Sequence, residues 1–167
     1  MKTLPAIALL FLVSLLLCAC PYKSDVGIDN GPSLKMNTAL LGTWHKASYP
    51  SDSTELIFTR SSAQKYLLTA IVNDGLDGYE TSHYEIWFSK IGQLQLVSFY
   101  DTKDKKYSFG ELALTGNLLD IKLLSDDNTS KQFNSVAEMK KFVEDIYDEN
   151  RVLYDHDVDL GELIKAK

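Results

Sequence analysis

Residues 107–123 read YSFGELALTGNLLDIKL, two runs of alternating apolar and polar residues separated by Gly116-Asn117. In the second run Leu119, Ile121 and Leu123 would lie on one face of an extended chain, because successive side chains of a strand point to opposite faces. A Gly-Asn pair between two such runs is typical of the tight turn of a β-hairpin. We therefore predict an antiparallel hairpin here.

The first of these runs changes the parity of its apolar positions at Gly110. Tyr107 and Phe109 precede the glycine on odd positions, whereas Leu112 and Leu114 follow it on even positions. A slip of one residue at a glycine is what a β-bulge produces, and bulges bend a sheet towards closure. We predict a bulge at Gly110 and a curved sheet.

The same pattern of short apolar runs and turn residues extends back to residue 39. The joints are rich in Gly, Asp, Asn and Pro, as in Asn73-Asp74-Gly75-Leu76-Asp77-Gly78. Such regular spacing predicts an antiparallel meander. The expected strands cover residues 41–47, 54–60, 64–73, 79–90, 93–100, 106–115 and 118–125.

One amphipathic helix is predicted over 135–149. Ser135 and Glu138 form a capping box, in which each side chain satisfies a backbone N–H group at the start of the helix. Apolar residues at helical spacing, from Val136 to Ile146, then give one apolar stripe. We expect this stripe to pack across a barrel mouth or on the outside of the sheet, and a final short strand to follow at 152–158.

These elements predict one mainly β (α+β) domain over 39–167, in which the meander forms a β-barrel or a β-sandwich with a C-terminal helix. The 167-residue chain carries 23 acidic and 17 basic residues, a formal net charge of −6. A negative balance argues against nucleic acid as a partner and against an electrostatic grip on anionic lipid.

The N-terminal segment has the features of a secretory signal. Lys2 is followed by an uncharged apolar run over 4–19, which ends in small residues before Pro21. Leu17-Cys18-Ala19-Cys20 resembles the bacterial lipobox. The resemblance implies cleavage between Ala19 and Cys20, a diacylglyceryl thioether on Cys20 and an acyl chain such as palmitate on its amine. The alternative is an uncleaved anchor helix.

Lipidation at Cys20 would place the protein in a bacterial cell envelope, facing the periplasm or exposed at the surface. The inner and the outer membrane both stay open. Several acyl chains hold a protein firmly, since each buried methylene adds about 0.8 kcal/mol. With residues 1–19 removed as a signal peptide, the mature chain has no free thiol. Residues 20–38, rich in Pro, Gly, Ser and Asp, are expected to form a flexible tether; docking along the domain is the alternative.

Gly42-Thr43-Trp44, at the start of the first predicted strand, resembles the Gly-x-Trp motif of lipocalins and related small barrels. The resemblance implies a barrel in which Trp44 closes one end and the interior holds an apolar ligand. No arginine lies between Arg60 and Arg151 to stack on this ring. Trp44 and Trp87 are candidates for ligand contact or for the core. So are the other aromatic residues of the strands: Tyr66, Tyr79, Tyr84, Phe88, Phe99, Tyr100, Tyr107 and Phe109.

Chemistry-bearing motifs are sparse. Asp155, Asp157 and Asp159 would share one face of a strand and offer oxygen ligands to a Ca²⁺-like ion, although they lack the glycine and glutamate of an EF-hand loop. A solvated acidic segment is the alternative. The three histidines show no metal-ligand spacing, and no nucleophile or phosphate-binding motif occurs. We expect no cofactor and no enzymatic activity.

Together these observations predict a lipid-anchored envelope protein whose domain binds non-covalently. Either the domain is an interaction module for a periplasmic protein, or it carries a small apolar ligand inside a lipocalin-like barrel. The first hypothesis predicts a contiguous exposed apolar patch of several hundred Å². The second predicts a cavity.

Overall fold

The seven strands predicted ahead of the helix all form, each within two residues of its expected bounds. The computed structural model describes residues 22–46, 54–73, 78–124, 131–148 and 162–166. In chain order its elements are the 3₁₀ helix η1 (Thr38–Leu40), β1 (Gly42–Lys46), β2 (Glu55–Arg60), β3 (Tyr66–Asn73), β4 (Tyr79–Ile91), β5 (Leu94–Asp101), β6 (Tyr107–Thr115), β7 (Leu118–Leu123), α2 (Val136–Asp148) and β8 (Leu163–Lys165).

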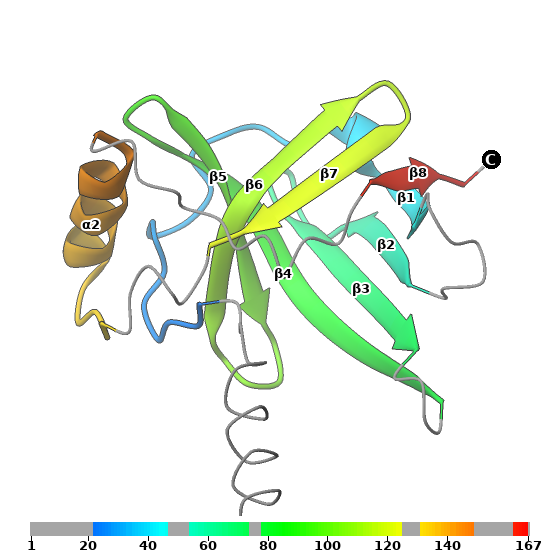
Figure 1. The fold of residues 1–167 in the computed structure, drawn as a ribbon, viewed down its shortest axis with the longest axis horizontal. Helices are drawn as coiled ribbons and strands as arrows, with labels where there is room; N and C mark the ends of the chain where they lie inside the picture. The colour runs from blue at the N-terminus through cyan, green and yellow to red at the C-terminus, as the bar shows by residue number, and fades with distance from the viewer. Residues whose placement is uncertain (1–21, 47–53, 74–77, 125–130, 149–161, 167) are drawn as a thin grey trace, which may run out of the picture.

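The sheet is a closed barrel rather than a sandwich. Each strand pairs antiparallel with the next in sequence, and the order β1 to β8 closes on itself (Figure 1). The short strand β8 completes the ring, because Leu163 pairs with Leu119 of β7 while Lys165 pairs with Trp44 of β1. The final strand expected at 152–158 lies outside the described residues.

One apolar cluster, here called the barrel core, packs inside the barrel. Its largest side chains, Trp44, Phe58 and Tyr66, are at most 1% exposed. One lies on each of β1, β2 and β3, and the cluster takes every second residue of β2 and of β3, as expected for strands with one face turned inward. The buried members are Leu40, Trp44, Leu56, Phe58, Tyr66, Leu68, Ile86, Val97, Phe99, Leu119, Ile121 and Leu163.

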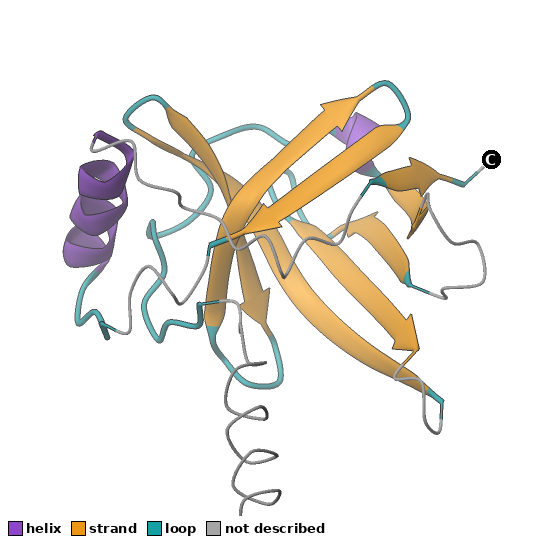
Figure 2. Cartoon of the chain, in the orientation of Figure 1, coloured by secondary structure: helices purple, strands orange, loops and turns teal. Residues whose placement is uncertain are grey.

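A second cluster, the outer core, packs on the opposite face of β4, β5 and β6. Helix α2 contributes Met139, Val143 and Ile146 to it, so the helix lies against the outside of the barrel and not across its mouth (Figure 2). The buried members are Tyr22, Ile28, Ile91, Leu94, Leu96, Phe109, Leu124, Phe133, Met139, Val143 and Ile146. Strands β4 to β6 are thus buried on both faces over part of their length.

The prediction of a flexible tether over 20–38 is wrong for the residues that the structure describes. Residues 22–37, here called the N-terminal strap, dock along the barrel. Ser24 exchanges two backbone hydrogen bonds with Tyr107 at 2.8 Å, and the backbone N–H of Tyr22 donates to Leu124 O at 3.0 Å. Tyr22, Ser24 and Ile28 are at most 2% exposed. Buried apolar residues among the Pro, Gly and Asp therefore make this segment part of the fold.

The predicted bulge at Gly110 is also wrong. Pairing reaches Gly110 in single steps from both sides, because the β5–β6 ladder ends at Val97–Gly110 and the β6–β7 ladder begins at Gly110–Leu123. The change of parity has another cause: Phe109 belongs to the outer core, whereas Leu112 packs against the barrel core. Glycine is required because a Cβ at position 110 would overlap the backbone oxygen of Lys122.

The capping box predicted for the helix is present. The Ser135 Oγ accepts a hydrogen bond from the Glu138 N–H at 3.2 Å, and Glu138 Oε2 accepts one from the Asn134 N–H at 3.1 Å. The first bond satisfies a backbone donor that the first turn of a helix leaves unpaired, whereas the second binds the residue before the N-cap and not the N–H of Ser135. Within the described ranges, no helix combines the length and the apolar character needed to cross a bilayer.

Candidate ligand cavity

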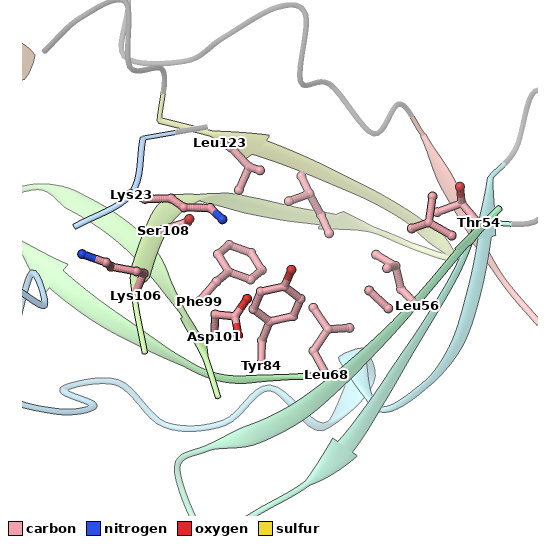
Figure 3. A pocket seen from close by; sticks show the side chains of 13 residues that line it. Lys23, Thr54, Leu56, Leu68, Tyr84, Phe99, Asp101, Lys106, Ser108 and Leu123 are labelled. Carbon is pink, nitrogen blue, oxygen red and sulfur yellow. The ribbon is translucent and has the colours of Figure 1, made fainter. Parts of the chain in front are cut away.

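One end of the barrel interior contains a cavity of about 210 Å³. Its walls are aliphatic and aromatic side chains from β2 to β7, and Figure 3 shows them converging on the hollow. The lining residues are Lys23, Thr54, Leu56, Leu68, Ala70, Val72, Tyr84, Phe99, Asp101, Lys106, Ser108, Ile121 and Leu123. The polar members gather at the rim, where the connections leave the strands.

The cavity exists because the inward side chains shorten along β2 and β3. On the inward face, Phe58 of β2 pairs with Leu68 of β3. Two residues closer to the mouth of the barrel, at the next inward position, Leu56 pairs with Ala70. Protein interiors are close-packed and contain few voids. The short side chain of Ala70 therefore leaves a space that a longer side chain would occupy. The space belongs to the mouth end of the barrel, where β3 and β5 end and β2 and β6 begin.

The opposite end of the barrel is closed by the strap and η1. The Trp44 Nε1–H donates to Leu40 O at 2.9 Å. The Tyr66 hydroxyl donates to Asn37 O at 3.0 Å and accepts from the Asn37 N–H at 2.6 Å. Burial raises the pKa of Tyr66 above its ordinary 10.0, although the Asn37 bond and the charge of Arg60 act in the opposite direction. This end is therefore plugged by neutral, fully bonded aromatic groups.

The rim of the cavity carries paired charges. Lys106 forms an ion pair with Asp25 of the strap, and the Lys23 Nζ lies 3.6 Å from the Asp104 Oδ2. Asp101 is held by its own turn, since its Oδ1 accepts hydrogen bonds from the N–H groups of Lys103 and Asp104. An apolar interior with a polar rim suits a molecule that is mostly apolar and carries a polar end.

The two tryptophans predicted as ligand or core residues both belong to the core. Trp44 is fully buried at the plugged end, outside the cavity lining. Trp87 is 5% exposed and lies on the outer face of the barrel, with the Tyr107 ring edge-on at 6.0 Å and Lys65 Nζ 4.8 Å from its own ring centroid. Its Nε1–H and Ser98 Oγ on the neighbouring strand are buried and have no hydrogen-bond partner among the described residues.

Of the aromatic residues singled out in the sequence, Tyr84 and Phe99 line the cavity. Leu56, Leu68, Ala70 and Val72 were not singled out, because an inward aliphatic residue has the same sequence pattern whether it faces a void or a neighbour. Pairing register, which the sequence did not give, decides between the two.

The remaining candidates lie outside the described residues. These are Ala19, Cys20 and the acidic positions Asp155, Asp157 and Asp159. Among the residues that the structure describes, no three His, Cys, Asp or Glu side chains form a group that could hold a metal ion. His45 and His83 are both exposed on the barrel wall.

A second recess of about 320 Å³ lies near the plugged end, between the strap, β4–β5 and β6. It shares no lining residue with the cavity and mixes polar with apolar groups, including Asn37, Gln95, Phe88 and Leu112. The cavity at the mouth is the better candidate for an apolar ligand, because polar lining groups have to be desolvated without gain.

Comparison of the chain with protein-family models, with curated proteins and with solved structures gives no match. The function is therefore argued from the geometry of the site.

Proposed function

We propose that this protein binds a small apolar or amphipathic molecule, non-covalently, in the cavity at the mouth of the barrel. The observation that carries the proposal is the apolar hollow of about 210 Å³ between Leu56, Leu68, Ala70, Phe99 and Ile121. Small barrels are usually filled by their own side chains, so an apolar void with one polar rim favours a ligand.

The volume limits what the cavity can hold. It exceeds the roughly 150 Å³ that accommodates benzene in an engineered protein core, and it is below the roughly 300–1,000 Å³ of sites for drug-sized ligands. A short acyl chain or one aromatic ring fits this range. The polar end of an amphipathic ligand would lie at the rim, near Ser108 and Asp101.

The proposal includes export and anchoring. The lipobox-like Leu17-Cys18-Ala19-Cys20 supports a lipid on Cys20, and the protein would then work at the surface of an envelope membrane. Changing Cys20→Ser is expected to release the mature protein from membranes or to leave the precursor unprocessed. If Cys18→Ser abolishes lipid labelling while Cys20→Ser does not, the assignment is wrong.

An interaction module remains the second candidate. It is supported by the exposed apolar side chains Leu67, Val72, Tyr79, Tyr147 and Ile164, each at least 37% exposed. They are spread over the β3–β4 hairpin, α2 and β8, so the described surface offers less support for one docking patch than the interior offers for a ligand.

The decisive test compares two neighbouring residues of β3. Ala70→Trp would fill the cavity, whereas Ile71→Trp would place the same ring on the outer face, because Ile71 follows Ala70 and points the other way. Binding of an apolar fluorescent probe, displaced by short-chain amphiphiles, is measured for both variants and the wild type. We expect probe binding to be lost in Ala70→Trp alone. Equal binding by all three proteins, or none by the wild type, would refute the proposal.

A further inference from the structure

The N-terminal strap begins beside the mouth of the cavity. The N–H of Tyr22 donates to Leu124 O directly after the end of β7, and its ring is 2% exposed in the outer core. The next residue, Lys23, lines the cavity itself. Figure 1 shows the blue start of the described chain next to the start of β6 and the end of β7.

This placement fixes how far the barrel can move from residue 20. Only two peptide links join Cys20 to Tyr22, so their Cα atoms are at most about 7 Å apart. Had residues 20–38 formed a flexible tether, the reach would be roughly 20–25 Å. Because the strap is docked, a lipid on Cys20 is attached within about 7 Å of Tyr22, whose neighbour Lys23 lines the cavity.

We propose that the mouth of the barrel rests on the membrane surface, with the cavity opening towards the lipid layer and the plugged end pointing away. This inference relies on the lipid anchor proposed above. The partner that covers the mouth is a lipid bilayer. Any ligand of the cavity would then come from the lipid layer directly below it.

The described part of the rim suits a membrane interface. Tyr79 and Val72 lie at the mouth end of the β3–β4 hairpin, and they are 65% and 41% exposed. Tyrosine is enriched at the level of lipid headgroups. On the strap side of the mouth, Lys103 and Lys105 of the β5–β6 turn are exposed next to the ion pair between Lys23 and Asp104. Lysine side chains reach towards headgroups while their stems stay in apolar surroundings.

The orientation can be measured with single cysteines, because a lipidated Cys20 is a thioether and leaves the mature chain without a free thiol. Lys103→Cys places a fluorophore at the mouth, and Asn117→Cys places one in the β6–β7 turn at the plugged end. The nine residues of β6 separate these turns, about 30 Å along the strand. Lipidated full-length protein is reconstituted into phosphatidylcholine–phosphatidylglycerol vesicles that contain brominated lipids.

We expect quenching by the brominated lipids to be several-fold greater at position 103 than at position 117. A Gly-Ser spacer of about 12 residues between Pro21 and Tyr22, with a reach of about 20 Å, should remove that difference. Equal quenching at both positions without the spacer, or stronger quenching at 117, would overturn the orientation. A difference that persists with the spacer would instead overturn the inference that the short connection between Cys20 and Tyr22 sets the orientation.

The two proposals fail separately. A mass spectrum of the purified protein reports whether Cys20 carries lipid before any vesicle is made. Probe binding by the Cys20→Ser protein in solution reports on the cavity. An unlipidated Cys20 refutes the anchor and the orientation with it, whereas a lipidated protein with the wrong quenching pattern refutes the orientation alone.

Discussion

The Nζ of Lys165 lies 5.4 Å from the centroid of the Trp44 ring, and it donates a hydrogen bond to Ala39 O at 2.7 Å. One side chain of β8 thereby joins η1 to β1 at the plugged end. No arginine between Arg60 and Arg151 is available to stack on Trp44; Lys165 of the last strand provides the cation instead. Antiparallel pairing of Trp44 with Lys165 brings the two residues together from distant parts of the chain.

Lys165→Met is expected to lower the free energy of unfolding by about 1–2 kcal/mol, because it removes both the cation–π contact and the hydrogen bond. Lys90→Met, at an exposed position of β4, is the control and should change stability by less than about 0.5 kcal/mol. Urea unfolding followed by tryptophan fluorescence measures both. Equal effects of the two substitutions would show that Lys165 does not fasten the barrel end.

Gly110→Ala is expected to destabilise the protein by about 3 kcal/mol or more, since the added methyl group overlaps the backbone of Lys122 between paired strands. Gly31→Ala is the matched control, because a Cβ at that position meets no atom within 4 Å. It should be neutral or slightly stabilising through the unfolded chain. Thermal unfolding followed by circular dichroism distinguishes the two. Similar midpoints would contradict the close approach at Gly110.

Tyr22→Ala should cost about 3–5 kcal/mol, as truncation of a buried aromatic side chain does. The ring packs edge-on to Phe133 at 6.2 Å, and its hydroxyl donates to Lys131 O at 3.0 Å. Tyr22→Phe keeps the ring and should cost about 1 kcal/mol. Chemical denaturation of the mature chain gives both values. If neither substitution matters, the strap is only a linker.

Stability is expected to fall above about pH 10. Burial raises the pKa of Tyr66 above 10.0 and likewise that of Tyr22 and Tyr107. A tyrosine whose pKa is higher in the folded than in the unfolded protein stabilises the fold in its neutral form. Its contribution to the free energy of unfolding is complete below pH 10.0, the ordinary pKa. The contribution is lost as pH rises through the folded-state pKa. Tyr66→Phe should weaken the alkaline decline without abolishing it. Unfolding free energies at a series of pH values check this, and an unchanged decline would exclude Tyr66 as a contributor.

The sequence predicted the elements well because their signals are local. Alternation located β7 through Leu119 and Ile121, and the capping box of Ser135 and Glu138 located α2. The choice between barrel and sandwich depends on how the last strand pairs, and the three residues of β8 carry almost no pattern. Closure is a property of register, which local patterns do not encode.

The errors share one physical cause, burial by a distant segment. The strap looked like a tether because Pro, Gly and Asp suggest a solvated chain, yet Ile28 is fully buried against strands and a helix far along the sequence. Phe109 points outward and is covered by the strap and α2. An apolar residue on the outer face looked like a change of parity, and this suggested a bulge. The aliphatic lining of the cavity was not predicted, because the effect of Ala70 depends on its pairing with Leu56.

The contact between Tyr22 and Phe133 also determines when this protein can finish folding. The outer core joins the strap, at the start of the described chain, to α2, which follows β7, over strands β4 to β6. A chain that emerges from its N-terminus therefore holds Tyr22 and Ile28 without their partners until residue 146 has followed. Long-range contacts of this kind form late, so the strap and the helix should be the last segments to gain protection from hydrogen exchange.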